Sequence, residues 1–183
     1  MDLEKINNMH FEKEYCVKAE YPEITVTHLP QKILIMLKKS YAGTKGELTA
    51  INQYSYEHYI IWSNPKLNKL SDTMEKISIQ EMRHYEILAK ILVRCGIDPK
   101  SCVYIDGNQN LCDYWKASNV SYEKTLTKMF ENNVLLEKRA IEDYNEIINV
   151  TDNENLRQIL LRIVQDEEIH LRYFKDVFEA LKN

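Results

Sequence analysis

The motif Glu-x-x-His occurs twice in this chain, and each copy interrupts a helical stripe of apolar residues. Glu81 and His84 form the first copy, and Glu167 and His170 form the second. A spacing of three residues places both side chains of one copy on the same side of a helix. An uncompensated charge in an apolar core is very costly. The repeated motif therefore predicts helices that pack around a polar centre.

A single glutamate precedes each copy on a separate predicted helix, Glu47 before the first and Glu137 before the second. Glu47 and Glu81 are centred on position 64, and Glu137 and Glu167 are centred on position 152. Both positions are predicted turns, so the two carboxylates of each hairpin lie at the same height. Their distances from the turns, about 25 and 22 Å at helical rise, sum to roughly one bundle length. The two pairs therefore meet at mid-height when a long connection joins the hairpins.

Apolar residues at steps of three and four predict four long helices. The first spans residues 31–62, the second begins at Pro65, and the third begins at Ser121. A capping-box pattern at Thr151 and Glu154 opens the fourth helix. Only four glycines and four prolines are present, which favours long uninterrupted helices.

The remaining segments complete the expected architecture. Residues 97–120 show no strong period, yet they are long enough to run the length of a bundle. We expect an all-α fold, a four-helix bundle over residues 31–183 with a long crossover between helices two and three. Residues 1–30 are expected to form an N-terminal extension, with a short β-like run at residues 24–27.

Four carboxylates that face one another in a core need compensating positive charge. Two divalent cations carry +4 and would balance them. The predicted ligands of two metal ions per chain are Glu47, Glu81, His84, Glu137, Glu167 and His170. We expect Glu81 and Glu167 to bridge the ions because each lies beside a histidine on its own helix. The alternative is that these are ordinary, partly exposed ionic groups.

Other polar residues near the motifs have less specific patterns. Gln80 and Asp166 each lie four residues before a motif histidine, where they either orient the ring or face solvent. Tyr54 lies two helical turns after Glu47 and is the candidate catalytic residue, as a donor of an electron or a hydrogen bond. A core tyrosine with a satisfied hydroxyl is the alternative. His58 is interpreted as a structural or surface histidine.

Charge and cysteine patterns exclude several classes. The net charge is −4 with mixed signs, and no basic stripe indicates nucleic-acid binding. The longest apolar runs are too short for a membrane span, and the N-terminus lacks a signal-peptide core. We therefore expect no membrane partner and a cytoplasmic location. Four cysteines without a Cys-x-x-Cys pair are expected to be reduced thiols.

The motifs resemble those of bacterioferritin over about residues 40–180. The resemblance rests on residues 47–54 (ELTAINQY), 81–84 (EMRH), 136–137 (LE) and 166–170 (DEEIH). Rubrerythrins and manganese catalases share the same ligand plan, so the chain is similar to the ferritin-like dinuclear-metal superfamily. The resemblance implies a ferritin-like four-helix bundle with a dinuclear iron or manganese centre.

The sequence departs from these relatives at three points. Thirteen residues follow His170, too few for the fifth helix of ferritin cages, so we expect a homodimer and no 24-subunit cage. Ala140 stands where rubrerythrins add a carboxylate, and their four-cysteine iron domain is absent. Met82 matches the bacterioferritin position that ligates haem, but methionine is a common residue at helix contacts, and haem is not expected.

Carboxylate-rich ligands with two imidazoles suit iron or manganese better than zinc or copper, and we expect iron first. The expected function is oxidation of the reduced metal pair by peroxide or dioxygen, as an oxidoreductase of peroxidase, ferroxidase or catalase type in oxidative-stress defence. An iron pair needs an external electron donor. One alternative is a manganese catalase-like enzyme, which needs no donor. The other is a metal-binding or storage protein without redox turnover.

Overall fold

The computed structural model describes residues 2–9, 15–104 and 112–182. Its elements run in the order α1 (Leu3–Asn7), α2 (Gln31–Ala42), α3 (Glu47–Trp62), the 3₁₀ turn η1 (Pro65–Leu67), α4 (Asn68–Arg94), β1 (Cys102–Tyr104), β2 (Cys112–Tyr114), the 3₁₀ turn η2 (Ala117–Asn119), α5 (Leu126–Val150) and α6 (Glu154–Lys182).

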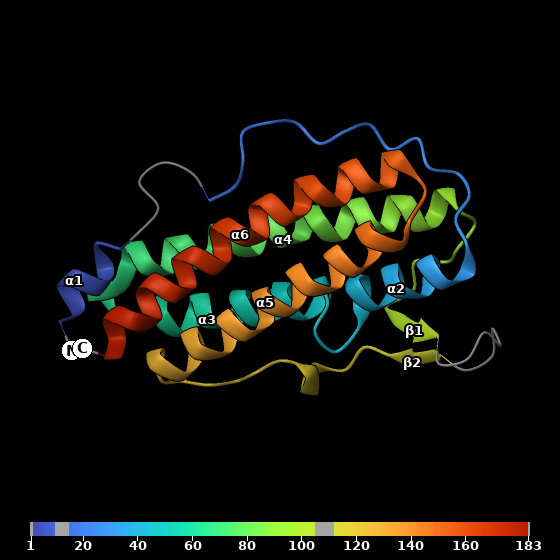
Figure 1. Ribbon diagram of the computed structural model, residues 1–183. Coiled ribbons are helices and arrows are strands. Elements are labelled where there is room, and N and C mark those ends of the chain that lie inside the picture. Colours follow the sequence, from blue (N-terminus) through green and yellow to red (C-terminus); the bar gives the residue numbers. More distant parts are fainter. Residues whose placement is uncertain (1, 10–14, 105–111, 183) are drawn as a thin grey trace.

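The long helices pack as two hairpins, α3 with α4 and α5 with α6 (Figure 1). The segment between α4 and α5 contains the antiparallel β1–β2 pair and runs along the bundle beside α3 and α5. The predicted all-α bundle with a long crossover between its hairpins is confirmed. No helix of the described residues combines the length and apolarity needed to cross a membrane.

The apolar core consists of two clusters, one on each side of mid-bundle. One cluster packs α2 against the parts of α4, α5 and α6 that contain Leu88, Tyr144 and Leu160. The other joins α3, α4, α5 and α6 around Tyr54 and Phe174. The predicted ligand residues lie between these clusters along each long helix, so apolar packing encloses them from both ends.

The prediction of one unbroken helix over residues 31–62 is wrong. The chain leaves the helix after Ala42 and resumes at Glu47, which makes Glu47 the first residue of α3. Gly46 comes so close to the preceding helix that a Cβ atom there would lie 2.3 Å from the carbonyl oxygen of Ser40. The glycine permits this close turn. As a result, the carboxylate of Glu47 enters the core from a helix N-terminus, where the helix dipole favours negative charge.

A Gly46→Ala variant is expected to lose stability because its methyl group would overlap the Ser40 carbonyl. Overpacking of this kind costs about 1–3 kcal/mol. Gly96 is the comparison, since its φ is +76° but nothing lies within 4 Å of an added Cβ. Gly96→Ala should cost about 1 kcal/mol from left-handed backbone strain alone. Urea unfolding of the two metal-free variants measures the difference, and equal losses would contradict the steric argument.

Two helix starts differ from the sequence prediction. The third long helix begins at Leu126 rather than Ser121, because the Ser121 amide donates to Gln53 Oε1 at 3.1 Å and holds this segment extended. The fourth is capped by Asn153 rather than Thr151: Asn153 Oδ1 accepts from the Leu156 amide at 2.9 Å. Asn64 caps the η1 turn that leads into α4 by accepting from the Lys66 amide, and Pro65 is the first residue of that turn.

Residues 15–30 form no helix or strand, so the predicted β-like run at residues 24–27 is wrong. The segment lies along the outer side of α6 and α4 (Figure 1). Arg162 on α6 donates to the carbonyls of Val17 and Ala19, and Asn155 donates to that of Glu23. We call residues 15–22 the strap. The division into an extension and a bundle remains a prediction.

Cysteine chemistry differs in part from the expectation. Cys102 is disulfide-bonded, so the prediction of four reduced thiols is wrong at this residue. Cys95 is a free thiol. Met82 is 46% exposed on α4.

A buried carboxyl outside the predicted ligand set lies on α3. Glu57 is 0% exposed, and its Oε2 accepts from Asn133 Nδ2 at 2.5 Å. Its Oε1 has no hydrogen-bond partner. Asn133 in turn accepts from Gln53 at 2.7 Å, so Glu57 belongs to a polar link between α3 and α5. Burial raises the pKa of Glu57 from 4.5 to about 8, although the Asn133 hydrogen bond opposes the rise.

Glu57→Gln should stabilise the protein in alkali relative to wild type. Folded wild type holds a proton that the unfolded chain releases above its ordinary pKa, so its stability falls as pH rises from about 4.5 to about 8. Glutamine removes this dependence, and the stability difference should shift by at most about 5 kcal/mol between pH 4 and 9. Urea unfolding at both pH values checks this. Exposed Glu168→Gln is the control, and a pH-independent difference for Glu57→Gln would refute the explanation.

Candidate metal centre

The six predicted ligand residues come together at mid-bundle, one or two from each long helix. Glu47 lies on α3, Glu81 and His84 on α4, Glu137 on α5, and Glu167 and His170 on α6. None is more than 4% exposed. The alternative of partly exposed ionic groups is therefore wrong, because all six side chains are enclosed by the core.

Two groups of side chains have ligand atoms close enough to surround a metal ion. In each group, one ligand atom per residue lies within 4.8 Å of all the others. The first group is Glu47, Glu81, His84 and Glu167. The second group is Glu81, Glu137, Glu167 and His170. Glu81 and Glu167 belong to both groups, whereas each of the other four residues belongs to one.

The shared carboxylates each direct one oxygen toward each histidine. Glu81 Oε2 lies 3.0 Å from His84 Nδ1, and Glu81 Oε1 lies 2.8 Å from His170 Nδ1. Glu167 Oε1 lies 3.1 Å from His84 Nδ1, and Glu167 Oε2 lies 3.3 Å from His170 Nδ1. This arrangement is the one that two carboxylates need to span a pair of cations. Both histidines direct Nδ1 inward, which leaves Nε2 for the surroundings.

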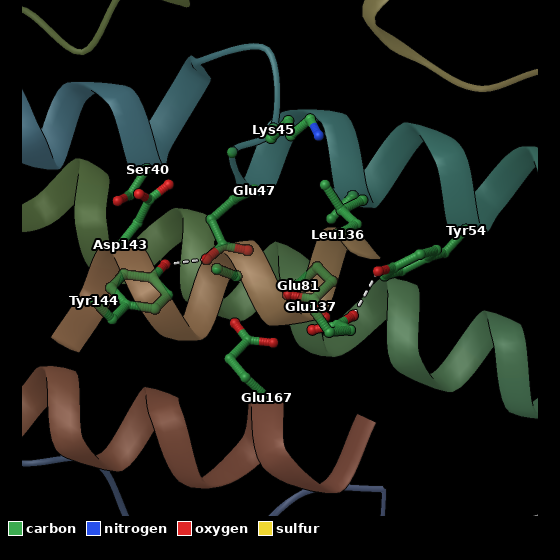
Figure 2. A pocket seen from close by; sticks show the side chains of 13 residues that line it. Ser40, Lys45, Glu47, Tyr54, Glu81, Leu136, Glu137, Asp143, Tyr144 and Glu167 are labelled. Carbon is green, nitrogen blue, oxygen red and sulfur yellow. Dashed lines mark hydrogen bonds between the residues drawn. The ribbon is translucent and has the colours of Figure 1, made fainter. Parts of the chain in front are cut away.

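A tyrosine holds each unshared glutamate from the opposite hairpin (Figure 2). Tyr54 on α3 donates to Glu137 Oε1 on α5 at 2.5 Å, and Tyr144 on α5 donates to Glu47 on α3. Both tyrosines are almost completely buried. The hydroxyl of Tyr54 is therefore satisfied by a predicted ligand. Each tyrosine restricts the rotation of its carboxylate partner.

The outer nitrogens of the two histidines meet different acceptors. His84 Nε2 lies 3.3 Å from Asp166 Oδ2, and His170 Nε2 lies 2.9 Å from the backbone carbonyl of Tyr15 in the strap. Asp166 was expected to orient His170 on its own helix or to face solvent; it contacts His84 on α4 instead. Such outer contacts fix the orientation of a ring whose other nitrogen binds metal.

Asp166 is held by four further donors. The Val17 amide lies 2.7 Å from Oδ1, and the Tyr21 hydroxyl lies 2.5 Å from Oδ2. Gln80 Nε2 donates to Oδ2 at 2.9 Å, and Arg162 pairs with Oδ1 at 2.7 Å. Burial alone would raise the pKa of Asp166, but the hydrogen bonds from His84, Tyr21 and Val17 lower it to about 2. The carboxylate is therefore ionised and fixed in position.

Charges within the cluster separate the carboxyls into two kinds. Burial, reinforced by repulsion from Glu167 and Glu81, raises the pKa of both Glu47 and Glu137 well above the usual range. Burial opposes ionisation of Glu81 too, but the adjacent His170 and His84 hold its pKa below the ordinary value. The free protein thus favours protonated unshared glutamates and an ionised Glu81.

The histidines respond to the same carboxylates. Burial disfavours their charged form, but Glu167 raises the pKa of His84 well above its ordinary value. Glu81 and Glu167 raise the pKa of His170 to about 9 in the same way. The metal-free cluster is therefore balanced by protons, which occupy groups that could instead bind cations.

The donor set fits divalent cations by a second observation. Glu81 Oε1, both oxygens of Glu167 and His170 Nδ1 are buried and make no hydrogen bond of good geometry, and their ion-pair contacts at 2.8–3.3 Å are all within the cluster. Buried polar atoms are almost always hydrogen-bonded, so a group of ligand atoms that lie within 4.8 Å of one another and lack good hydrogen bonds fits a cation between them. Carboxylate oxygens with one imidazole per group suit iron or manganese.

A small cavity adjoins the carboxylates (Figure 2). Glu47, Glu81, Glu137 and Glu167 line one part of it, and its lining extends to exposed Lys45. The total empty space is about 310 Å³, but only about 10 Å³ can hold the centre of a water-sized molecule. That is room for about one water. Ala140 contributes to the lining, so the small side chain leaves space beside Glu137.

Sequence reasoning missed the strap and Tyr144. Tyr144 had a usable signal, because it follows Glu137 by seven residues just as Tyr54 follows Glu47. The contributions of Tyr15 and Tyr21 have no such pattern, since they depend on where an irregular segment lies. His58 is a structural histidine as expected: its Nδ1 lies 2.9 Å from the Ser71 carbonyl on α4.

The fold and this cluster together define a class: a bundle of long helices whose buried carboxylates and histidines can bind metal. Residues 43–183 match the family model described as Ferritin, ferritin-like domain. The chain belongs to this family. The predicted resemblance to the ferritin-like superfamily is thereby confirmed.

Two solved structures illustrate the likeness. KatB, a manganese catalase from Anabaena PCC7120, has 18% sequence identity and a TM-score of 0.69, with 91% of this chain and 81% of that chain covered. The bacterioferritin of Desulfovibrio desulfuricans, which has a diiron site, has 26% identity and a TM-score of 0.67, with 83% and 81% covered. A search of curated proteins finds no match.

Proposed function

We propose that the protein is a dinuclear metal oxidoreductase, with iron as the first candidate, that reacts with peroxide or dioxygen. The observation that carries the proposal is the pair of four-residue groups that share Glu81 and Glu167. The relatives include a manganese catalase and a bacterioferritin, which supports an oxidoreductase of this broad kind.

The ligand roles follow from the geometry. Glu81 and Glu167 would bridge the two ions, because each directs one oxygen toward each histidine. Glu47 with His84 would complete one position, and Glu137 with His170 would complete the other. Two such ions, when bound, supply adjacent redox centres that can both contact one small oxidant.

The protein residues restrict which molecule reaches that centre. The cavity beside the carboxylates holds about one water-sized molecule, which favours an oxidant as small as dioxygen or peroxide over a larger substrate. Leu136, Ala50 and Ala140 give part of its wall an apolar surface. Tyr54 and Tyr144 keep Glu137 and Glu47 oriented while protons move at the centre.

Tyr54 is the proposed catalytic residue. Its hydroxyl contacts Glu137 and its side chain lines the cavity, which supports a role as donor of an electron or a hydrogen bond to an oxidant there. Its burial and its hydrogen bond to Glu137 raise the pKa of Tyr54 well above the ordinary value, so it keeps its proton at neutral pH. An external electron donor is part of the proposal if the metal is iron. A homodimer remains our expectation.

Addition of peroxide to metal-loaded protein tests the function. Peroxide loss that requires reduced iron or an electron donor is the expected result. Oxygen release without any reductant would instead indicate a manganese catalase-like reaction. If neither iron- nor manganese-loaded protein consumes peroxide or dioxygen, the oxidoreductase proposal fails and a metal-binding or storage role replaces it. Elemental analysis of the same samples gives the metal content.

A further inference from the structure

The two candidate metal positions have matching inner residues. Each position contains one histidine, both shared carboxylates and one unshared glutamate. Each unshared glutamate accepts a hydrogen bond from one buried tyrosine of the opposite hairpin. The positions differ in the groups behind these residues and in the helix N-terminus at which Glu47 lies.

The groups behind the histidines do not match. His84 Nε2 faces the carboxylate of Asp166, whereas His170 Nε2 faces the backbone carbonyl of Tyr15. Asp166 and Gln80 occupy equivalent places, each directly before a shared glutamate. The two Glu-x-x-His motifs thus differ in the residue before each glutamate. Asp166 provides a carboxylate behind His84, whereas Gln80 is an amide and provides no negative charge behind His170.

The strap and its neighbours maintain this difference. Gln80 Nε2 lies 3.3 Å from His84 Nε2, and it donates to Asp166 and to the Tyr21 hydroxyl at 2.7 Å. The Tyr21 hydroxyl donates to the same Asp166 oxygen that faces His84. Arg162 binds the other oxygen and also the strap carbonyls. Asp166 is consequently fixed with Oδ2 toward His84, and its charge is only partly offset by the guanidinium.

We propose that the two metal positions are unequal, and that the His84 position binds a divalent cation more tightly because Asp166 supports its imidazole. This inference rests on the proposed dinuclear function. A carboxylate behind a metal-bound imidazole raises the basicity of the ligand, and loss of such a partner weakens metal binding by about 10–100-fold. The carbonyl of Tyr15 orients His170 but adds no net charge. Asp166 and Tyr21 are thus positioning residues for one position.

Single-position variants test the inference, because binding of a first ion to shared carboxylates would by itself weaken binding of a second. Glu137→Gln leaves the His84 position, and Glu47→Gln leaves the His170 position. The metal-free variants are titrated with Mn²⁺ by calorimetry and by electron paramagnetic resonance. We expect the Kd for Mn²⁺ of the Glu137→Gln protein to be about tenfold or more below that of the Glu47→Gln protein. Equal Kd values would overturn the inference.

Adding Asp166→Asn to each of the two single-position variants tests whether Asp166 causes the difference in affinity. It should raise the Kd of the His84 position by about 10–100-fold and leave that of the His170 position within roughly threefold. Tyr21→Phe is the milder second variant, which should weaken the same position only. Equal effects of these changes on both positions would also overturn the inference. If wild type itself binds no Mn²⁺ or Fe²⁺, the proposed dinuclear function fails, a result separate from two equal positions.

Discussion

A Glu167→Gln variant is expected to lose both metal ions, whereas Glu47→Gln should keep about one ion per chain. The reason is that Glu167 belongs to both groups of ligand atoms and Glu47 to only one. Glutamine preserves the size of the side chain, so the change removes charge without opening a cavity. Protein loaded with Fe²⁺ or Mn²⁺ under reducing, oxygen-free conditions, desalted and measured by elemental analysis, gives the stoichiometry.

Glu57→Gln is the matched control for this experiment. Glu57 is as buried as Glu167 but lies outside both groups, and its contact is Asn133. This variant should keep two ions per chain. Retention of two ions by Glu167→Gln would contradict the ligand assignment, and so would equal losses in the Glu47 and Glu167 variants.

The long helices and the cluster of buried carboxylates and histidines could be predicted because one periodic signal determines both. In α4 and α6, the glutamate and histidine share the stripe that carries Ile77, Leu88, Ile163 and Phe174. Any packing that buries those apolar residues also buries the polar ones. The equal distances of the paired glutamates from their turns then bring them to one height.

The break before Glu47 could not be predicted from the same signal. Apolar residues continue at helical spacing on both sides of it, so periodicity alone predicts one helix over residues 31–62. What ends the helix is a close approach of Gly46 to the Ser40 carbonyl, which is a tertiary fact. The consequence for the site is direct, since Glu47 becomes the first residue of α3 instead of a mid-helix residue.

The strap shows a second limit of sequence reasoning. Its contributions are a backbone carbonyl of Tyr15, a backbone amide of Val17 and the hydroxyl of Tyr21. Backbone groups leave no mark on residue type, and residues 15–22 have no period to place them. The asymmetry between Asp166 and Gln80 is visible in the sequence, but its meaning depends on which histidine each residue faces.

Metal binding is expected to weaken steeply in acid. In the free protein, burial and the neighbouring carboxylates raise the pKa of Glu47 and Glu137. The carboxylates also raise the pKa of His84, and that of His170 to about 9, against the effect of burial. We therefore expect these groups to hold protons near neutral pH, and each must release its proton to become a ligand. Acid favours the free protein because it binds protons that the loaded protein cannot keep.

The expected size of this effect follows from proton linkage. Binding of two ions near pH 7 should release up to about four protons per chain, and one pH unit of acidification should then lower the product of the two binding constants by up to about 10⁴-fold. Calorimetry in buffers of different ionisation enthalpy counts the protons directly. Glu57→Gln should release the same number, because Glu57 is protonated in both states at this pH and is no ligand. Release of less than about one proton by wild type would show that the cluster is not charge-balanced by protons in the free protein, and that cations bind to groups already ionised.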